Sequence, residues 1–138
     1  MRLLLDTCVI IDWLTDADPF ERNVWDILND PGTKLYVSAE TVRELIVSFN
    51  NKKLLSKYWK TAEEMLVAMK EEAMVDILPI SERTMFTYSR LTLNEAMDHR
   101  APSDHVIIAH AITEHITLLS SDQKFAFYRN QGLELIEY

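Results

Sequence analysis

Residues 1–6 read MRLLLD, a short apolar run that ends in a carboxylate and is followed by Thr7. A continuous apolar run of this length is typical of a strand that is buried on both faces at the centre of a parallel sheet. Because ligands bind outside the carboxyl ends of such strands, Asp6 would carry a negative charge to that edge. The same side chain could instead cap a helix over residues 8–14 by accepting a backbone N–H. The apolar run alone does not decide between these two roles of Asp6.

The order of the predicted elements extends this strand into a fold. Apolar runs that are typical of strands occur at residues 34–37, 75–78 and 117–120, and a partly alternating run at 133–137 is typical of an edge strand. Helical patterns lie between them. The alternation predicts a three-layer α/β/α domain with a mainly parallel sheet of four to five strands.

Several helices have local signals of their own. Asp18 followed by Pro19 predicts a helix that begins there, with the proline at its first position. A helix over residues 61–73 carries an apolar face that includes Met65 and Met69. A further helix begins near Ser81, and its candidate core residues are Met85, Tyr88 and Leu91.

The composition is that of one globular domain over residues 1–138. The chain is 48% hydrophobic and 26% charged, and two glycines and four prolines give no sign of a linker. The N-terminal apolar run is too short for a signal peptide, and no stretch has the length of a membrane span. We therefore expect a cytoplasmic protein without membrane contact.

The net charge of −8 excludes a protein that coats nucleic acid with a basic surface. It favours cationic partners, either metal ions or a basic protein. A nucleic-acid substrate would need a local basic patch, and the one basic stretch contains Lys52, Lys53 and Lys57 beside Tyr58 and Trp59. Such a stretch can follow a phosphate backbone and stack a base, although most such runs are only a solvated helix face.

Four acids fall at positions where chemistry is done in such folds. Asp6, Asp104 and Asp122 lie at strand ends or helix starts, and Glu44 lies on the exposed side of the helix that follows the second strand. Each could be a simple cap or surface charge, as Glu40 could be if it pairs with Arg43. Together, clustered carboxylates repel one another and favour a bound cation. Their oxygen atoms suit Mg²⁺ or Mn²⁺, and such a site suits metal-assisted phosphodiester hydrolysis.

A zinc hydrolase is a weaker interpretation. His105, His110 and His115 are five residues apart on the predicted helix, so neighbouring side chains point about 140° away from each other. They cannot chelate one ion from one face of the helix.

Four segments resemble the PIN-domain ribonucleases, and within them the VapC-type toxins of toxin–antitoxin pairs. They are residues 3–7 (LLLDT), 42–45 (VREL), 102–109 (PSDHVIIA) and 118–125 (LLSSDQKF). The resemblance also covers chain length, element order and the spacing of the acids. It implies that Asp6, Glu44, Asp104 and Asp122 form an acidic metal-binding quartet, with Thr7 and Ser120 as polar supports.

The resemblance implies an RNA substrate and a basic antitoxin partner, for which Trp13 and Trp25 are plausible apolar anchors. It also agrees with a homodimer, which we expect because Trp59, Met65 and Met69 offer more apolar surface than one small sheet needs. The alternative is a catalytically silent PIN-like module that acts through a protein partner or in a DNA-binding toxin–antitoxin complex. Loss of metal-dependent RNA cleavage on Asp6→Asn would separate the two.

Overall fold

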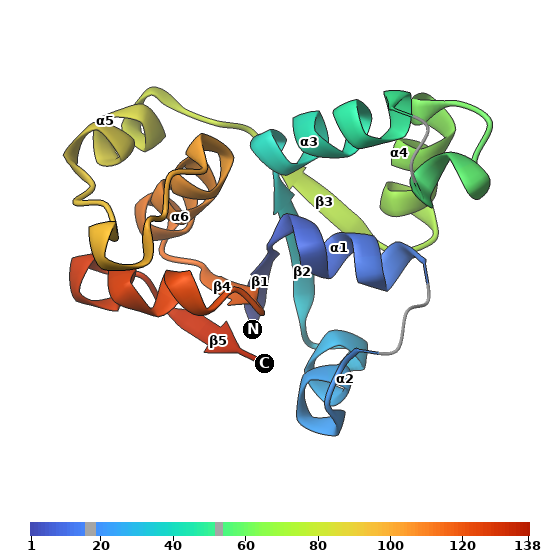
Figure 1. Ribbon diagram of the computed structural model, residues 1–138. Coiled ribbons are helices and arrows are strands. Elements are labelled where there is room, and N and C mark those ends of the chain that lie inside the picture. The colour runs from blue at the N-terminus through green and yellow to red at the C-terminus, as the bar shows by residue number, and fades with distance from the viewer. Residues whose placement is uncertain (16–18, 52–53) are drawn as a thin grey trace.

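The fold is built on one sheet of five parallel strands. The computed structural model describes residues 1–15, 19–51 and 54–138. The strand order is β3-β2-β1-β4-β5, and every pair of neighbours is parallel (Figure 1). The bounds are β1 Arg2–Leu5, β2 Lys34–Ser38, β3 Val75–Leu78, β4 Thr117–Ser120 and β5 Leu135–Glu137.

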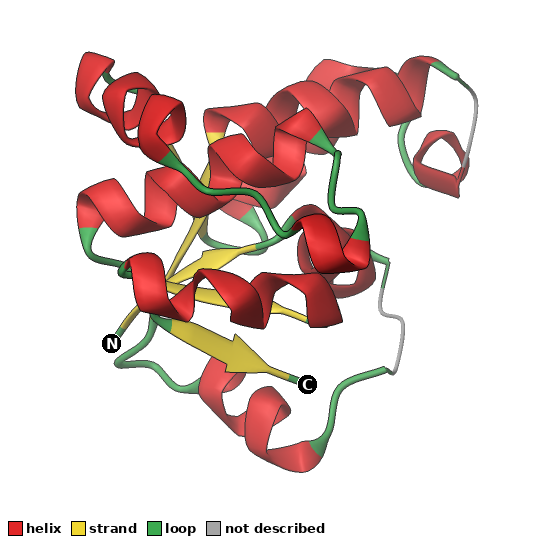
Figure 2. Ribbon diagram, turned by 60° about the vertical axis from the view of Figure 1, so that its left-hand side comes forward, coloured by secondary structure: helices red, strands yellow, loops and turns green. Residues whose placement is uncertain are grey.

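Helices cover both faces of this sheet, as Figure 2 shows. The prediction of a three-layer α/β/α domain is therefore confirmed. The α-helices are α1 Thr7–Leu14, α2 Arg22–Asn29, α3 Ala39–Asn50, α4 Ala62–Glu71, α5 Glu82–Arg90 and α6 Pro102–Glu114. Three further segments are 3₁₀ helices, η1 Leu54–Lys57, η2 Glu95–Met97 and η3 Gln123–Gln131.

Strand β1 lies at the centre and is buried on both faces, as its apolar run predicts. Leu3 and Leu5 point into a larger core that is covered by α1 to α4, whereas Leu4 points into a second core formed with α6 and η3. All three side chains are fully buried. The two faces follow from the period of two along a strand.

The chain changes direction across the sheet between β1 and β4. From β1 it passes to β2 and β3 on one side, and it then returns to add β4 and β5 on the other side (Figure 1). In open parallel sheets such a switch point leaves a crevice outside the carboxyl ends of the two strands. Asp6 directly follows β1, and Asp122 lies two residues after β4.

Helix α2 begins later than the sequence predicts. Its first residue is Arg22, so Pro19 is not at the first helical position, and Asp18 lies outside the described residues. Phe20 explains the difference, because its buried ring packs against the rings of Trp13 and Tyr138 at centroid distances of 6.2 and 5.4 Å. This contact holds the chain before Arg22 out of the helix.

Three methionine assignments need correction or refinement. Met65 and Met69 are fully buried in the larger core, so they do not supply the surplus apolar surface from which a dimer was expected. Met85 is 41% exposed and is not a core residue. Helix α5 instead meets α6 through small polar side chains, where the Thr113 hydroxyl donates a hydrogen bond of 2.8 Å to Thr87.

Within the described part of the chain, no helix combines the length and the apolar character that crossing a membrane requires.

Candidate functional site

Asp6 is both a helix cap and a buried charge at the switch point. Its Oδ1 accepts a hydrogen bond of 2.8 Å from the Thr7 backbone N–H, and its Oδ2 accepts one of 2.7 Å from the Ser120 hydroxyl. The side chain is only 5% exposed. Burial raises the pKa of Asp6 to about 6, against the hydrogen bond from Ser120, and the charge of Asp104 adds to the rise. The two roles that the sequence left open therefore coexist.

Glu44 faces this buried acid from α3. It is half-buried rather than exposed, and its Oε1 accepts a hydrogen bond of 2.6 Å from the Thr7 hydroxyl. Because that hydroxyl donates to Glu44, the neighbouring Thr41 hydroxyl, 3.1 Å away, donates to Thr7. Burial raises the pKa of Glu44, and the charges of Asp104 and Asp6 raise it further.

Glu40 lies one turn before Glu44 on the same helix but has a different environment. Its Oε1 accepts hydrogen bonds from Arg43, the shorter at 2.6 Å, and one of 2.9 Å from the Ser103 hydroxyl. The bond with Arg43 lowers the pKa of Glu40. The predicted pairing of Glu40 with Arg43 is confirmed, and Glu44 is the glutamate that faces the other acids.

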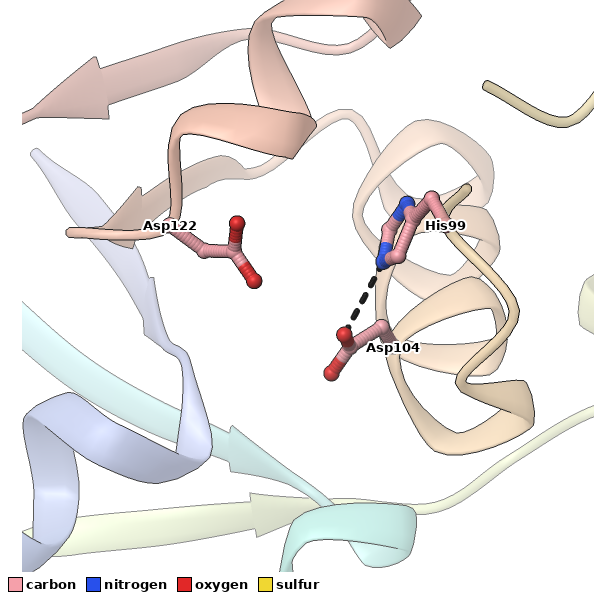
Figure 3. Close-up of side chains that lie close together, drawn as sticks. All are labelled: His99, Asp104 and Asp122. Atoms are coloured by element: carbon pink, nitrogen blue, oxygen red, sulfur yellow. Dashed lines mark hydrogen bonds and ion pairs between the residues drawn. The ribbon is translucent and has the colours of Figure 1, made fainter. Parts of the chain in front are cut away.

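Asp104 and Asp122 lie close to each other and to His99 (Figure 3). One ligand atom from each of these three residues lies within 4.8 Å of the others. Asp104 is in the first turn of α6, as predicted, and its Oδ2 lies 2.9 Å from Nε2 of His99. Asp122 caps η3 by accepting a hydrogen bond of 2.9 Å from the Lys124 backbone N–H.

Ser120 joins the two strand ends. Its hydroxyl donates to Asp6, and its oxygen accepts a hydrogen bond of 3.1 Å from the backbone N–H of Asp122. Thr7 makes the corresponding link between the end of β1 and Glu44. Both predicted polar supports thus contact the acids, which holds the acid-bearing segments in fixed positions relative to one another.

Three of the four acids, Asp6, Glu44 and Asp104, share one electrostatic environment, and Asp122 is grouped with Asp104 and His99. The charge of Asp104 raises the pKa of both Asp6 and Glu44, so the three carboxylates lie close enough to repel. Among the described residues, the basic side chain closest to this group is His99, whose Nε2 lies 2.9 Å from Asp104 and forms an ion pair only when the ring is protonated. Partly buried carboxylates without lysine or arginine partners suit a divalent cation, and their oxygen atoms are the ligands that Mg²⁺ and Mn²⁺ prefer. The donor set therefore fits the metal that the sequence analysis expects.

The comparison with protein families agrees with this geometry. The PIN domain profile matches residues 3–131, nearly the whole chain. The chain belongs to the PIN-domain family. PIN domains are a family of nucleases.

Solved structures with the same fold as this PIN domain include chains of several VapBC complexes. VapBC2 from Rickettsia felis, bound to a DNA fragment from its promoter, has a TM-score of 0.74 at 20% identity and covers 99% of this chain and 98% of its own. VapBC-1 from nontypeable Haemophilus influenzae has a TM-score of 0.71 at 22% identity, with the same coverage. VapBC-5 from Mycobacterium tuberculosis has a TM-score of 0.64 at 20% identity, again with this coverage. A search among curated proteins finds no match.

His99 is the residue of this PIN domain that the sequence analysis missed. It is 2% exposed and precedes α6 in a segment, residues 93–101, that reads as polar and irregular. Nothing in the local pattern separates it from a surface residue. The signal is only its place five residues before Asp104, which brings the two side chains together when the chain turns into α6.

The predicted basic stretch is only partly described. Lys52 and Lys53 lie outside the described residues. Lys57 ends η1, and its side chain is exposed, as is that of Tyr58 beside it. The role of these lysines in binding RNA stays a prediction.

Proposed function

We propose that this PIN domain is a Mg²⁺- or Mn²⁺-dependent endoribonuclease whose site is Asp6, Glu44, Asp104 and Asp122. The observation that supports the proposal is the mutual repulsion of Asp6, Glu44 and Asp104 beside the switch point of a parallel sheet. A ligand atom of Asp122 lies within 4.8 Å of one of Asp104, and none of these acids forms an ion pair with a lysine or arginine among the described residues. Such a site is costly to the fold unless a cation binds there. A bound ion would supply a hydroxide at neutral pH and would stabilise charge on the phosphate.

Asp6 and Asp122 hold the metal most directly in this proposal, because they follow the adjacent strands β1 and β4. Glu44, with one oxygen held by the Thr7 hydroxyl, would complete the ligand set or orient the attacking water. Asp104 completes the ligand set from α6. Thr7 and Ser120 act as supports, since their hydrogen bonds keep Glu44 and Asp6 from rotating away.

The direct test is cleavage of an RNA by the purified protein. We expect cleavage in Mg²⁺ or Mn²⁺, none in excess EDTA, and recovery when the metal is added back. Activity that persists in excess EDTA would contradict the proposed mechanism. Cleavage products that grow from one end of the RNA, rather than from internal sites, would contradict endonuclease action.

A basic antitoxin is the proposed protein partner, and the toxin of a toxin–antitoxin pair is the proposed biological role. Support comes from the VapBC complexes that share the fold and from the net charge of −8, which would steer a basic protein. Trp13 and Trp25 pack edge to face at 5.4 Å, and Trp25 is 46% exposed. If a basic protein encoded beside this one binds Trp13→Ala and Trp25→Ala variants as tightly as wild type, these anchors are wrong.

A homodimer and a cytoplasmic location remain part of the proposal. With Met65 and Met69 buried, the apolar surface left for a dimer includes Val47, Leu54 and Val67, which are exposed on α3, η1 and α4. Sedimentation equilibrium at micromolar concentration would test this proposal. A single species of 16.1 kDa would refute the dimer.

The second candidate is a catalytically silent module in a DNA-binding complex. It is favoured by the similar structures from Rickettsia felis and Salmonella typhimurium, which are VapBC complexes bound to DNA. The cleavage experiment separates the candidates, because a silent module would bind its partner and leave RNA intact in every metal.

A further inference from the structure

A chain of three hydrogen bonds ends on Asp104. The backbone N–H of Asn94 lies 3.1 Å from the Tyr128 hydroxyl oxygen, which lies 2.9 Å from Nδ1 of His99. Nε2 of His99 lies 2.9 Å from Oδ2 of Asp104. Asn94, His99 and Tyr128 are all buried, so these polar atoms depend on one another and not on water.

The directions of these hydrogen bonds follow from the backbone N–H of Asn94, at which the chain begins. A backbone N–H can only donate, so the Tyr128 oxygen accepts from Asn94 and its own proton is free to be donated. Among the contacts of the described residues, Nδ1 of His99 is the acceptor within reach of that proton, so the buried hydroxyl is satisfied when a neutral His99 ring carries its lone pair on Nδ1. A neutral imidazole with a lone pair on Nδ1 carries its proton on Nε2. Nε2–H therefore donates to the Asp104 carboxylate.

We propose that His99 is a positioning residue that fixes the Asp104 carboxylate for metal binding, and that Tyr128 sets its tautomer. The proposal rests on the metal site of the proposed function. With Oδ2 held by His99, the Oδ1 of Asp104 is left free of that bond, beside a ligand atom of Asp122 that lies within 4.8 Å of one of Asp104 (Figure 3). Hydrogen bonds of this kind orient the carboxylate and histidine ligands of many metal sites.

The same bonds exclude His99 as a metal ligand, although its ring lies within 4.8 Å of both aspartates. A nitrogen ligates through a lone pair, and Nε2 uses that position for its proton. The ring cannot easily turn to offer Nδ1, because Phe125 and His105 pack against it at centroid distances of 5.5 and 4.6 Å. With His99 held in this way, Asp104 and Asp122 offer only oxygen atoms from this side of the site, which favours Mg²⁺ or Mn²⁺ over zinc.

Two measurements on metal-free protein test the proposal without any substrate. The first is the ¹⁵N NMR signature of the His99 ring at a pH of about 8, where an ordinary histidine is neutral. We expect the Nε2–H tautomer in wild type and a shift toward the other tautomer in Tyr128→Phe. The second is Mn²⁺ affinity by calorimetry for wild type, His99→Phe, His99→Gln and Tyr128→Phe.

The expected affinities have a definite order. His99→Phe keeps a ring but loses the donor, and Mn²⁺ affinity should fall about 10- to 100-fold, as for other residues that orient a ligand. His99→Gln restores an N–H near the same place and should recover most of that loss. The Mn²⁺ affinity of Tyr128→Phe should lie between those of His99→Phe and His99→Gln. Tyr88→Phe, which removes the hydroxyl of a half-exposed tyrosine on α5, is the matched control and should bind like wild type.

Three results would overturn the proposal. They are an Nδ1–H tautomer in wild type, wild-type Mn²⁺ affinity in Tyr128→Phe, and a His99→Gln variant that binds as weakly as His99→Phe. If His99→Phe does not fold, the wild-type tautomer and the Tyr128→Phe affinity still decide. If Mn²⁺ binding depends on His99 and Tyr128 but the protein cuts no RNA, this inference is upheld and the proposed nuclease function is contradicted. If the protein cuts RNA but His99 has the Nδ1–H tautomer, the nuclease function is upheld and this inference is contradicted.

Discussion

Two regions of this PIN domain are rich in acid, and only one has the features of a metal site. Helix α4 carries Glu63, Glu64 and Glu71, which are all exposed, and Glu72 follows at its end. Glu63 and Glu64 lie in the first turn, where the helix dipole favours negative charge, and Glu64 accepts a hydrogen bond from the Lys60 backbone N–H. Water and local structure account for these charges.

Local structure explains only part of the acids at the switch point, where Asp6 caps α1 and Asp122 caps η3, because it does not account for their burial beside one another. Asp6 is almost fully buried, Glu44 is half-buried, and each has a raised pKa to which the charge of Asp104 contributes. The difference between the two regions is burial beside other acids, because both contain about the same number of carboxylates. A count of acids in a sequence therefore does not separate the two regions, whereas the position of the acids relative to strand ends does.

The largest effect on cleavage is expected for Asp6→Asn. Metal-dependent cleavage should fall to the level of the metal-free protein, while the thermal midpoint in EDTA stays the same or rises, since a buried charge is removed. Glu63→Gln on α4 should change neither quantity. Cleavage assays and thermal unfolding of the two variants side by side provide the test. An Asp6→Asn protein that is less stable yet still cuts would mean that Asp6 is only a cap.

The second prediction uses the two glutamates of α3. Glu44→Gln should lower the cleavage rate by about 10²- to 10⁴-fold, the range for loss of a group that moves or orients a proton. Glu40→Gln should keep wild-type cleavage, because Glu40 is bound to Arg43 and Ser103. Single-turnover rates with saturating metal measure both variants. Equal losses of cleavage rate in the two variants would show that α3 contributes only its negative charge and no specific group.

The third prediction concerns pH and stability without metal. The pKa of Asp6 is raised from 3.8 to about 6 in the folded protein, so the folded state binds more protons than the unfolded state between these values. The stability that Asp6 contributes is present below pH 3.8 and is lost as the pH rises through about 6. The loss is on the order of 1–3 kcal/mol.

Denaturant unfolding in EDTA measures the free energy of unfolding of wild type and of Asp6→Asn. The difference between these two free energies should grow between pH 4 and pH 6. At neutral pH, added Mg²⁺ should return stability to wild type by binding only the folded state, and not to the variant. A difference between the two proteins that does not change with pH would contradict the raised pKa.

The smallest expected effect is that of Lys57→Gln. RNA binding should weaken, and the slope of log affinity against log salt concentration should decrease by roughly 0.7–0.9, as expected for one lost phosphate contact. Mn²⁺ affinity should not change. Lys70→Gln, in the last turn of α4, is the control lysine. If the two variants have the same salt slope, Lys57 contributes no specific contact with RNA.

Much of the fold could be predicted because its signals are local. The run before Asp6 is apolar without alternation, and β1 is buried on both faces as a result. The helix predicted to begin near Ser81 does so, with Ser81 as its cap. The positions of Asp6 and Asp122 after β1 and β4 could be predicted for the same reason, since a parallel sheet brings its carboxyl ends to one edge.

The residues that were misjudged depend on contacts between distant segments. Phe20 leaves its expected helix to pack on Tyr138, at the other end of the sequence. Met85 fits a helical stripe, but α6 meets α5 through threonines instead. His99 becomes part of the site only because η3 places Tyr128 behind it. Periodicity describes the faces of an element and does not say which neighbour covers each face.

The strand order also determines when the site can exist during protein synthesis. The segment up to Glu44 supplies β1, β2 and two of the acids, whereas Asp104 and Asp122 are translated later, with β4 inserting beside β1 more than a hundred residues after it. Domains are made from the N-terminus at about 5–20 residues per second. A growing chain that ends between Glu44 and Asp104 therefore carries half of the four acids, and the proposed site can assemble only after Asp122 has left the ribosome.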